Sequence, residues 1–371
     1  MKVIIAAAQT GGHINPGIAI ANKIKQENKN ARIMFIGTTR GLENDLVPRA
    51  GFELRTIEAY GINRKISMSN IKNMFKTLKG LKEAKKIVKE YKPDIVIGTG
   101  GFICGPVLMA AKKYKMPTVL HESNAFPGVA VKLLAKKVDT ILLGFEDAKQ
   151  RLPKAKKIVV TGTPTKIKKI QLSKIQKEKM IAELGLEKNL PIVLVFGGSQ
   201  GAKSINSTLI DIIKSKANKN YQIIWASGPK QYDIIKETLK EDKIDINKID
   251  NVKILPYIYN MEEIMNLVDV VIARSGAMTT TEIAITGKPA IFIPFPFATE
   301  NHQEYNARVL EKIGAAKIIL DKDLNKESLS STLNEILKDK NKLVQMSKNA
   351  EKVAISDVEE KIYKEIEKLI K

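Results

Sequence analysis

The chain has 371 residues, of which 44% are hydrophobic and 5% aromatic, and its formal net charge is +22. This length suffices for two domains with extensive cores, and the lack of an uninterrupted apolar run of about 18 residues argues against a membrane-spanning helix. A single cysteine, Cys104, excludes an internal disulfide and agrees with a reducing cytoplasm, and only three histidines accompany it, which argues against a structural zinc site.

The positive charge leaves three kinds of partner to consider: nucleic acid, an anionic membrane surface and a polyanionic substrate. Lysines occur along the whole chain, aromatic residues are few, and no nucleic-acid motif is present. These features argue against nucleic acid and leave the other two partners open.

Residues 1–163 are expected to form a first α/β domain, because short apolar runs alternate there with helical patterns. Such alternation is typical of a doubly wound parallel sheet. The predicted strands are 3–8, 32–36, 95–98, 118–121, 140–143 and 157–161.

The first predicted strand leads into a glycine-rich turn that ends at His13, and a helix is expected from about Pro16. Two glycines let the backbone approach a ligand closely, and His13 would lie at the carboxyl edge of the sheet, where it could take a proton. The turn lacks the G-x-G-x-x-G pattern of dinucleotide sites. A histidine near a helix start is also commonly a capping or packing residue, so both interpretations of His13 stay open.

A second glycine-rich turn, residues 98–106, also leads into a helix, and His121, Glu122 and Asn124 follow the next strand. His121 and Glu122 should point to opposite sides of an extended chain, which argues against a bidentate metal site. Asn124 offers a donor and an acceptor suited to a sugar hydroxyl. The alternative is a turn residue before Pro127.

Residues 71–86 form a basic amphipathic stretch in which lysines flank apolar side chains at helical spacing. The apolar members are Ile71, Met74, Phe75, Leu78 and Leu81, and the lysines are Lys72, Lys76, Lys79, Lys82, Lys85 and Lys86. The stretch could rest on an anionic bilayer, to which each near-surface lysine contributes about 1 kcal/mol. Alternatively, its apolar stripe faces the protein core.

A basic polar run from Lys154 to Lys179 separates the two halves, and residues 164–346 are expected to form a second α/β domain. Its predicted strands are 192–196, 222–226, 252–255, 270–273 and 290–294. The chain beyond Leu324 is expected to be helical, and a C-terminal helix at about 347–371 could pack back on the first domain.

The strand at 192–196 leads into a third glycine-rich turn, residues 197–204. This turn nearly satisfies the spacing of a Walker A loop, but Ala202 stands where the glycine before the lysine is required. The difference argues against an ATPase, whereas Ser199 and the neighbouring N–H groups can still hold a diphosphate.

Residues 268–282 are the most informative stretch, because an apolar β-branched run ends there at Arg274 and a hydroxyl cluster then opens a helical pattern. A helix that begins after a parallel strand presents free N–H groups and the positive end of its dipole, where phosphates are commonly held. Glu282 lies about one turn further in and could accept both hydroxyls of a ribose. A capped helix with a surface glutamate is the alternative.

Two further segments complete this predicted site. Tyr257 and Ile258 follow the strand at 252–255, where a flat base could meet backbone groups and an apolar side chain. Gln303 and Asn306 share a helical face at i, i+3, so both amides could meet one ligand. The second half therefore fits a nucleoside diphosphate that bears a sugar, and the first half would supply an acceptor site and a base.

These ordered motifs resemble those of the GT-B glycosyltransferases that make the bacterial cell-wall precursor lipid II. The matching segments are Thr10-Gly11-Gly12-His13, Gly100-Gly101-Phe102, His121-Glu122-Ser123-Asn124, Thr161-Gly162-Thr163-Pro164, Gly197-Gly198-Ser199-Gln200-Gly201-Ala202, Arg274-Ser275-Gly276-Ala277 and His302-Gln303. They extend over nearly the whole chain and are jointly specific. The resemblance implies a GT-B fold, in which two Rossmann-like doubly wound domains face a central cleft.

The resemblance also implies an activity, namely the inverting transfer of N-acetylglucosamine from UDP-GlcNAc to the 4-hydroxyl of the muramic acid unit in undecaprenyl-diphosphate-linked lipid I. The product, lipid II, would serve peptidoglycan synthesis and thereby cell shape and division. The enzyme would be a peripheral protein on the cytoplasmic face of the bacterial plasma membrane. It would need no metal or other cofactor, because helix starts and Arg274 could supply positive potential at the leaving UDP.

Site roles follow from the same resemblance. Ser199, Gly276, Ala277, Met278 and Thr279 would hold the diphosphate, Glu282 the ribose, Ile258 the uracil, and Asn124 and Gln303 the donor sugar. Thr10, Gly11 and Gly12 would shape the acceptor side, with His13 as the candidate base. Lys166 stands where the family commonly has an arginine, so a bidentate phosphate contact would become a single-point one. Cys104 replaces a usual serine, which should alter packing more than chemistry.

Three alternatives stay open. An epimerase acting on UDP-GlcNAc would share this architecture, and a different GT-B lipid glycosyltransferase would accept a diacylglycerol or a sterol. A basic nucleic-acid binder would show an affinity that falls steeply with salt.

Overall fold

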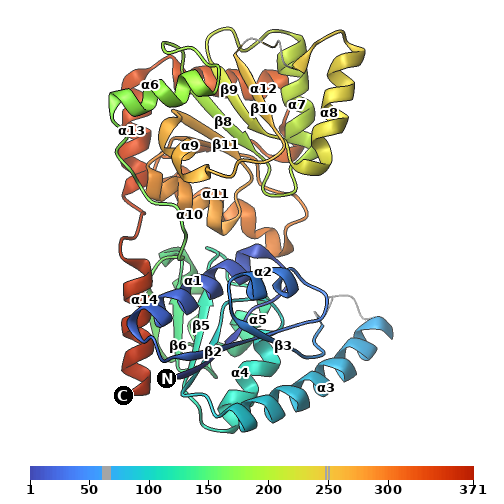
Figure 1. Ribbon diagram of the computed structural model, residues 1–371, viewed down its shortest axis with the longest axis vertical. Helices are drawn as coiled ribbons and strands as arrows, with labels where there is room; N and C mark the ends of the chain where they lie inside the picture. The colour runs from blue at the N-terminus through green and yellow to red at the C-terminus, as the bar shows by residue number, and fades with distance from the viewer. Residues whose placement is uncertain (61–67, 247–248, 250) are drawn as a thin grey trace. The chain divides into compact units, whose positions relative to one another are not determined.

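The computed structural model describes residues 1–60, 68–246, 249 and 251–371, with side chains described for all of these except 68–75. The described residues form two compact units, Met1–Thr165 with Ile355–Lys371, and Lys166–Ala354 (Figure 1). The last helix of the chain therefore belongs to the unit that begins it. Within the described part of the chain, no helix is both long and apolar enough to cross a membrane.

The first unit is built on a parallel sheet whose described strands follow the order β3-β2-β1-β4-β5-β6-β7. The strands are β1 (Lys2–Ala6), β2 (Arg32–Gly37), β3 (Glu53–Thr56), β4 (Ile95–Gly98), β5 (Thr118–Glu122), β6 (Thr140–Leu143) and β7 (Ile158–Val160). The helices are α1 (Gly11–Glu27), α2 (Glu43–Arg49), α3 (Met68–Tyr91), α4 (Cys104–Lys113), α5 (Val129–Leu134), η1 (Glu146–Arg151) and α14 (Val358–Ile370).

Both faces of this sheet are covered, as in other parallel sheets. Successive side chains of β1 point to opposite faces, so Val3 and Ile5 pack with α1 and α14, whereas Ile4 packs in the cluster that includes α3, α4 and α5. Helix α1 begins at Gly11, about five residues before the predicted start at Pro16. His13 therefore lies within the first turn of the helix.

The second unit repeats this plan with a parallel sheet of strand order β10-β9-β8-β11-β12-β13 among its described residues. Its strands are β8 (Ile192–Phe196), β9 (Gln222–Ala226), β10 (Val252–Leu255), β11 (Val270–Ala273), β12 (Ala290–Phe292) and β13 (Ala316–Ile318). Its helices are α6 (Lys174–Glu183), α7 (Lys203–Lys214), α8 (Pro229–Glu241), α9 (Met261–Leu267), α10 (Ala277–Thr286), η3 (Thr299–Asn301), α11 (His302–Lys312), η4 (Asp321–Asp323), α12 (Lys326–Leu337) and α13 (Lys340–Glu351).

The direction of winding reverses once in each sheet. In the first unit β1 lies between β2 and β4, and in the second β8 lies between β9 and β11. Loops that leave the carboxyl ends of two strands on either side of such a reversal run apart and leave room for a ligand. The fold therefore singles out the loops after β1 and β4, and those after β8 and β11.

Candidate functional site

The glycine-rich turns predicted from the sequence all follow these four strands. Residues 7–10 and 99–103 leave β1 and β4 in the first unit, and residues 197–202 and 274–276 leave β8 and β11 in the second. Because each pair of strands is hydrogen-bonded and parallel, the two turns of a pair lie at the same edge of one sheet. Each unit thus has its own candidate site at its switch point.

His13 is held against the turn after β4. Thr99 Oγ1 donates a hydrogen bond of 2.8 Å to the His13 carbonyl oxygen. A Cβ atom built on Gly100 would lie 2.4 Å from His13 Cδ2, and Gly100 and Gly101 have φ values of +114° and +79°. Only glycine meets both requirements, the positive φ and the close approach of the imidazole.

The ring nitrogen His13 Nδ1 lies 3.2 Å from the carbonyl oxygen of Ala8. A carbonyl oxygen can only accept, so Nδ1 must carry the proton and donate it to this bond. In the neutral ring, this tautomer puts the basic lone pair on Nε2. The ring is half-buried and Thr10 is exposed as the N-cap residue of α1, so the turn that carries His13 opens to solvent.

The loop after β5 is organised by a buried carboxylate that the sequence did not single out for this role. Glu122 accepts hydrogen bonds from Asn124 N and Asn124 Nδ2, each at 2.9 Å, and from Gly128 N at 2.8 Å. The Asn124 amide is thereby oriented with its nitrogen toward Glu122. No local pattern predicts that Glu122 would be buried with three N–H donors.

His121 is a structural residue in the same strand. Its Nε2 donates to the Gly162 carbonyl at 3.0 Å, so Nδ1 is the acceptor for the Ser123 hydroxyl at 3.3 Å. Burial lowers the pKa of His121 below its ordinary value. Both imidazole nitrogens are thus engaged within the first unit.

In the second unit, the turn after β8 is closed by backbone contacts. A Cβ on Gly201, which has a φ of +77°, would lie 2.1 Å from the Ser227 carbonyl oxygen. Gly198 has a φ of +89°, and Ser199 is exposed at the tip of the turn. The packing of this turn explains its glycines and leaves the Ser199 hydroxyl and nearby N–H groups at the surface.

Helix α10 begins at the next strand end, with Gly276 as its N-cap residue. A Cβ built there would meet no described atom within 4 Å, so a ligand can approach the backbone closely. Ala277, Met278 and Thr279 follow in the first turn and are all half-buried. Their N–H groups and the helix dipole suit a diphosphate. Glu282 is half-buried in the second turn of α10.

The Arg274 side chain links the end of β11 to the segment after β12 and to the first turn of α7. Its guanidinium donates to the Ile293 and Pro294 carbonyls at 3.0 and 3.1 Å, and to Ser204 Oγ at 2.9 Å. It also pairs with Asp321, and the two side chains are only 11% and 22% exposed. The positive charge expected to act on the leaving UDP is thus compensated within the unit.

Gln303 and Asn306, predicted to share one ligand, have different environments. Asn306 is fully buried and its Nδ2 donates to the Ser275 carbonyl at 3.1 Å. Gln303 is half-buried, and its Oε1 accepts from Phe295 N at 3.0 Å, so its amide NH2 group can donate to a ligand. Because Ser275 Oγ also donates to the Gln303 carbonyl at 2.8 Å, α11 begins beside α10.

Two residues predicted to contact the donor, Ile258 and Lys166, lie on other segments of the chain. Ile258 is 3% exposed and follows the edge strand β10, between the exposed residues Tyr257 and Tyr259. Its backbone can therefore meet a ligand although its side chain packs inside. Lys166 is exposed at the first position of the second unit. The hydrogen bonds described above unite the turns at 197–204 and 274–279 with Gln303, and they include neither of these residues.

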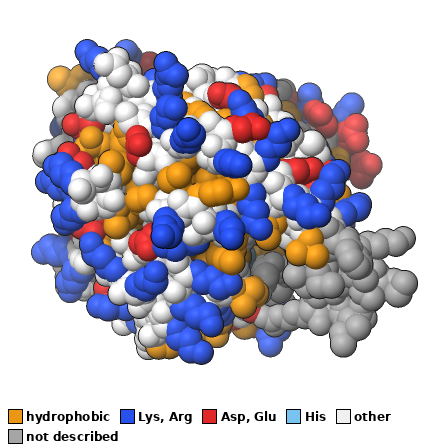
Figure 2. Space-filling view, turned by 90° about the horizontal axis from the view of Figure 1, so that it is seen from below, with side chains coloured by type: hydrophobic (Ala, Val, Ile, Leu, Met, Phe, Trp, Pro, Cys, Tyr) orange, Lys and Arg blue, Asp and Glu red, His pale blue; other side chains and the backbone are white. Residues whose placement is uncertain are grey.

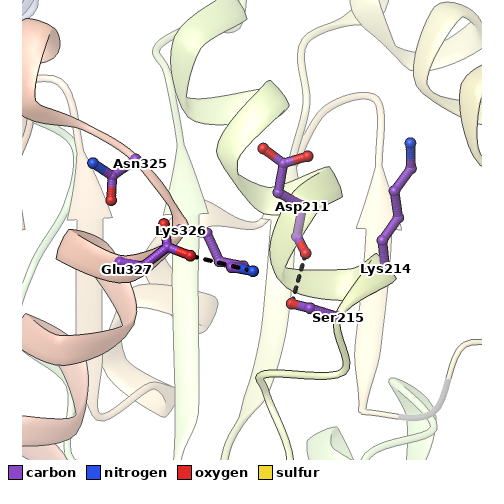
Figure 3. A pocket seen from close by; sticks show the side chains of 6 residues that line it. All are labelled: Asp211, Lys214, Ser215, Asn325, Lys326 and Glu327. Carbon is purple, nitrogen blue, oxygen red and sulfur yellow. Dashed lines mark hydrogen bonds and ion pairs between the residues drawn. The ribbon is translucent and has the colours of Figure 1, made fainter.

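A pocket of about 440 Å³ lies elsewhere, between the end of α7 and the start of α12 (Figure 3). Its polar groups serve the helices themselves. Ser215 Oγ donates to the Asp211 carbonyl at 2.8 Å, Lys326 pairs with Glu327, and Asn325 caps α12. Since Lys326 pairs with Glu327 and Lys214 pairs with Asp242, we assign no substrate to this pocket.

Cys104 lies at the start of α4, where the resemblance placed a usual serine. The thiol is fully buried, lies 3.3 Å from Gly100 N, and can donate to the Gly100 carbonyl at 3.2 Å. Burial raises the pKa of Cys104 to about 12. The thiol is therefore a neutral hydrogen-bonding and packing group of the second glycine turn.

Known protein families and related proteins match this chain over most or all of its length. Residues 3–143 match the glycosyltransferase family 28 N-terminal domain, and residues 192–362 match the glycosyltransferase family 28 C-terminal domain. The UDP-N-acetylglucosamine--N-acetylmuramyl-(pentapeptide) pyrophosphoryl-undecaprenol N-acetylglucosamine transferase of Acetivibrio thermocellus is 45% identical over 372 residues, with 100% of this chain and 99% of that one covered. A Bacillus cereus enzyme of the same name, numbered 1, is 40% identical over 371 residues and 100% of both chains. The crystal structure of Acinetobacter baumannii MurG matches with a TM-score of 0.79 and 27% identity, over 99% of each chain.

Proposed function

The chain belongs to glycosyltransferase family 28, and we propose how its two sheets divide the reaction of that family. It is a UDP-GlcNAc-dependent N-acetylglucosaminyltransferase that acts on the lipid-linked muramyl-pentapeptide and serves peptidoglycan synthesis. The prediction of two Rossmann-like doubly wound domains of the GT-B class is confirmed. Relatives that are 40–45% identical over the full chain do not favour the epimerase or the other lipid glycosyltransferases.

The second unit binds the UDP part of the donor in this proposal. The observation that carries it is the meeting of three groups at one switch point: the turn with Ser199, the start of α10 at Gly276, and the Gln303 amide. Helix N-termini and exposed N–H groups favour a diphosphate, and Glu282 is close enough along α10 to serve a ribose. The backbone at Ile258 would receive the uracil, Lys166 would make a single-point phosphate contact, and Asn124 would serve a sugar hydroxyl.

The first unit supplies the base. His13 Nε2 would accept the proton of the attacking 4-hydroxyl as that oxygen displaces UDP from the anomeric carbon, with inversion of configuration. Thr10, Gly11 and Gly12 would shape the acceptor side of this turn. The Nδ1–H bond to Ala8 supports the proposal, because it fixes the tautomer that a base requires.

Kinetics of His13→Ala test this assignment. A general base contributes about 10²- to 10⁴-fold, so kcat should fall by that range while the Kd for UDP, measured by calorimetry, stays unchanged. The assay uses labelled UDP-GlcNAc with the lipid-linked acceptor, and a reaction without acceptor detects any altered sugar that an epimerase would release. An unchanged kcat at saturating substrates would reject His13 as the base.

The reaction is also proposed to proceed without a metal ion. The N-termini of α7 and α10 supply positive potential at the switch point, as oxyanion-type stabilisation requires. Transfer should therefore keep its rate after dialysis against a chelator. A loss of activity that Mg²⁺ or Mn²⁺ restores would contradict this part of the proposal.

A peripheral position on the cytoplasmic face of the plasma membrane is the remaining proposal, and the basic stretch at 71–86 carries it. Ile71, Lys72, Met74 and Phe75 lie outside the described side chains. Further along α3, the small residues Gly80, Ala84 and Val88 are buried, whereas Leu78 is 49% exposed. Leu81, Ile87 and Tyr91 also pack against the core, so one face of the helix serves the core as the alternative interpretation expects, whereas Leu78 and several lysines stay exposed.

Two cations lie against one aromatic ring near the start of this stretch, and further along Lys79 pairs with Glu83. The Arg40 guanidinium and Lys76 Nζ lie 3.9 and 4.7 Å from the ring centroid of Tyr60. The sequence has no Asp or Glu between Glu58 and Glu83. The face drawn in Figure 2 shows a group of hydrophobic side chains with many Lys and Arg and fewer Asp and Glu side chains around it. Such a combination suits an anionic bilayer.

Vesicle sedimentation tests the membrane contact. Changing the exposed Lys76, Lys79 and Lys82 to Glu should weaken binding to anionic vesicles by at least about 10²-fold, at about 1 kcal/mol per lysine lost. The same change in charge at Lys230, Lys236 and Lys240, all exposed on α8, is the matched control and should have a much smaller effect. Equal binding by the two triple variants would refute α3 as the contact.

A further inference from the structure

Glu43, the first residue of α2, is a buried carboxylate that joins two loops of the first unit. The side chain is fully buried. Its Oε1 accepts from Thr38 N and Thr38 Oγ1, both at 2.8 Å, and its Oε2 accepts from Gln9 N at 2.9 Å. Thr38 follows β2 and Gln9 follows β1, so one carboxylate fixes two neighbouring turns at the edge that carries His13.

The surrounding chain makes room for this carboxylate. A Cβ atom built on Gly41 would lie 1.9 Å from Glu43 Oε2, and one built on Gly37 would lie 2.6 Å from Glu43 Cγ. Two glycines therefore border the side chain, and any other residue at either position would displace it. A buried carboxylate is costly unless hydrogen bonds compensate it, and here three donors do so.

The Gln9 N–H that Glu43 binds belongs to a strained residue. Gln9 has a φ of +77°, in the left-handed region that costs free energy for a residue other than glycine. Leu42 N also donates to the Gln9 carbonyl, at 3.4 Å. Both backbone groups of Gln9 are thus bound by the segment that contains Glu43, which compensates the unfavourable conformation.

The conformation of Gln9 determines where the preceding carbonyl points. Ala8 O accepts from Thr10 N at 3.1 Å and from His13 Nδ1 at 3.2 Å, across the tight turn that Gln9 makes. If Gln9 relaxed to a negative φ, the chain would leave β1 in another direction and Ala8 O would turn away from the imidazole.

We propose that Glu43 is a positioning residue for the transfer reaction, which acts through Gln9 and Ala8 to hold His13 as a base. This inference rests on the proposed role of His13. The carboxylate keeps Gln9 in the left-handed conformation, the turn directs Ala8 O at Nδ1, and the resulting hydrogen bond keeps the lone pair on Nε2. Glu43 itself is fully buried and would act only through these residues.

Glu43→Gln tests the proposal with almost no change of volume. The amide has one acceptor oxygen, so either Gln9 N–H or the Thr38 donors lose theirs. We expect kcat to fall at least tenfold while the KM for UDP-GlcNAc stays within twofold. The acid limb of the kcat profile should move to lower pH, because the hydrogen bond to Ala8 O favours the protonated ring.

A second substitution should reverse part of the effect of Glu43→Gln on kcat. Gly adopts a positive φ without strain, so Gln9→Gly in the Glu43→Gln background should restore kcat at least threefold and return the acid limb toward its original pH. Gln9→Val tests the role of the Gln9 conformation while Glu43 stays intact. A β-branched residue is unfavourable at this positive φ, so the variant should have a lower kcat. Failure of both effects would overturn the proposal.

Glu365→Gln is the matched control, because Glu365 is a nearly buried carboxylate of the same unit that pairs with Lys157 and Lys368 on the α14 side. It should lower the Tm without moving the acid limb. A shift of the limb by this control would show a general effect of lost stability and overturn the assignment. If His13→Ala keeps full kcat, the base role fails; if His13→Ala is inactive and Glu43→Gln is normal, only the positioning role fails.

Discussion

Arg274→Met distinguishes a structural role of Arg274 from a direct electrostatic role at the leaving UDP. The substitution keeps much of the side-chain volume and removes the hydrogen bonds to Ile293 O, Pro294 O and Ser204 Oγ, and the pair with Asp321. Removing one partner of a buried ion pair costs about 3–5 kcal/mol. Because the Asp321 side chain is 22% exposed, water compensates part of this cost, and we expect about 2–3 kcal/mol.

Thermal unfolding of the full chain measures the effect. A loss of 1 kcal/mol lowers the Tm of a domain of about 150–250 residues by roughly 2–4 °C, so the transition of the second unit should fall by roughly 4–12 °C. The double variant Arg274→Met/Asp321→Leu leaves no unpaired charge and should recover at least about half of that loss. Its Kd for UDP should stay raised, since the double variant still lacks Arg274 and Asp321, the two side chains that bind Ser204 Oγ.

The competing view makes the opposite prediction. If Arg274 acted mainly on the charge of the leaving UDP, the single variant would keep its Tm, and kcat would be equally low in the single and double variants. That pair of results would refute the structural role. Arg308→Met is the control, because Arg308 pairs with Glu304 and Glu311 on the surface of α11 with its side chain 42% exposed. Such surface pairs contribute at most about 1 kcal/mol.

Three further predictions concern single side chains. Glu282→Ala should raise the Kd for UDP by about 10- to 100-fold in calorimetry, since a hydrogen bond to a charged group contributes about 1.5–3 kcal/mol; an unaltered Kd would exclude the ribose contact. Burial lowers the pKa of His121 below 6.5, so as the pH falls below that value the unfolded chain binds a proton before the folded chain does. The free energy of unfolding should therefore fall by up to about 1.4 kcal/mol per pH unit in this range, and a His121→Gln variant should lose this dependence on pH. With its pKa raised to about 12, Cys104 should resist a thiol reagent at pH 8 in the native chain and react once unfolded, and fast native labelling would contradict its burial.

The central strands could be predicted from the sequence because burial on both faces makes them continuous apolar runs. The predictions at 95–98, 140–143, 192–196, 222–226 and 270–273 coincide with β4, β6, β8, β9 and β11, and the prediction at 252–255 coincides with the edge strand β10, in which Lys253 is exposed between two buried residues. Two edge strands were missed. Glu53–Thr56 is mostly exposed and has a single apolar residue, and Ala316–Ile318 is only three residues long. Pairing with a neighbour, which no local pattern records, makes both of them strands.

The glycine turns could also be predicted, since a glycine after a buried strand is a local signal. The residues that hold these turns could not. Glu43 and Glu122 occupy positions where the sequence suggests ordinary surface acids, but Glu43 binds a donor from the loop after β1, and Glu122 binds three donors of its own loop. Asp321 meets Arg274 only because η4 follows β13 at the same edge of the sheet. The contacts of Glu43 with Gln9 and of Arg274 with Asp321 join segments far apart in the chain, so the composition of either segment does not predict them.

The two units stabilise their turns with groups of opposite sign, and the sign agrees with the chemistry proposed for each. In the first unit Glu43 and Glu122 are anionic acceptors of N–H groups, and the proposed base His13 of that unit would gain a proton. A second-unit carboxylate without a partner would repel a diphosphate, by about 2 kcal/mol for two unit charges 8 Å apart at an effective dielectric constant near 20. There the carboxylate of Asp321 is paired with Arg274, which donates to carbonyl oxygens instead. Because that pair is neutral as a whole, the N-termini of α7 and α10 supply the positive potential beside it, where the diphosphate is proposed to bind.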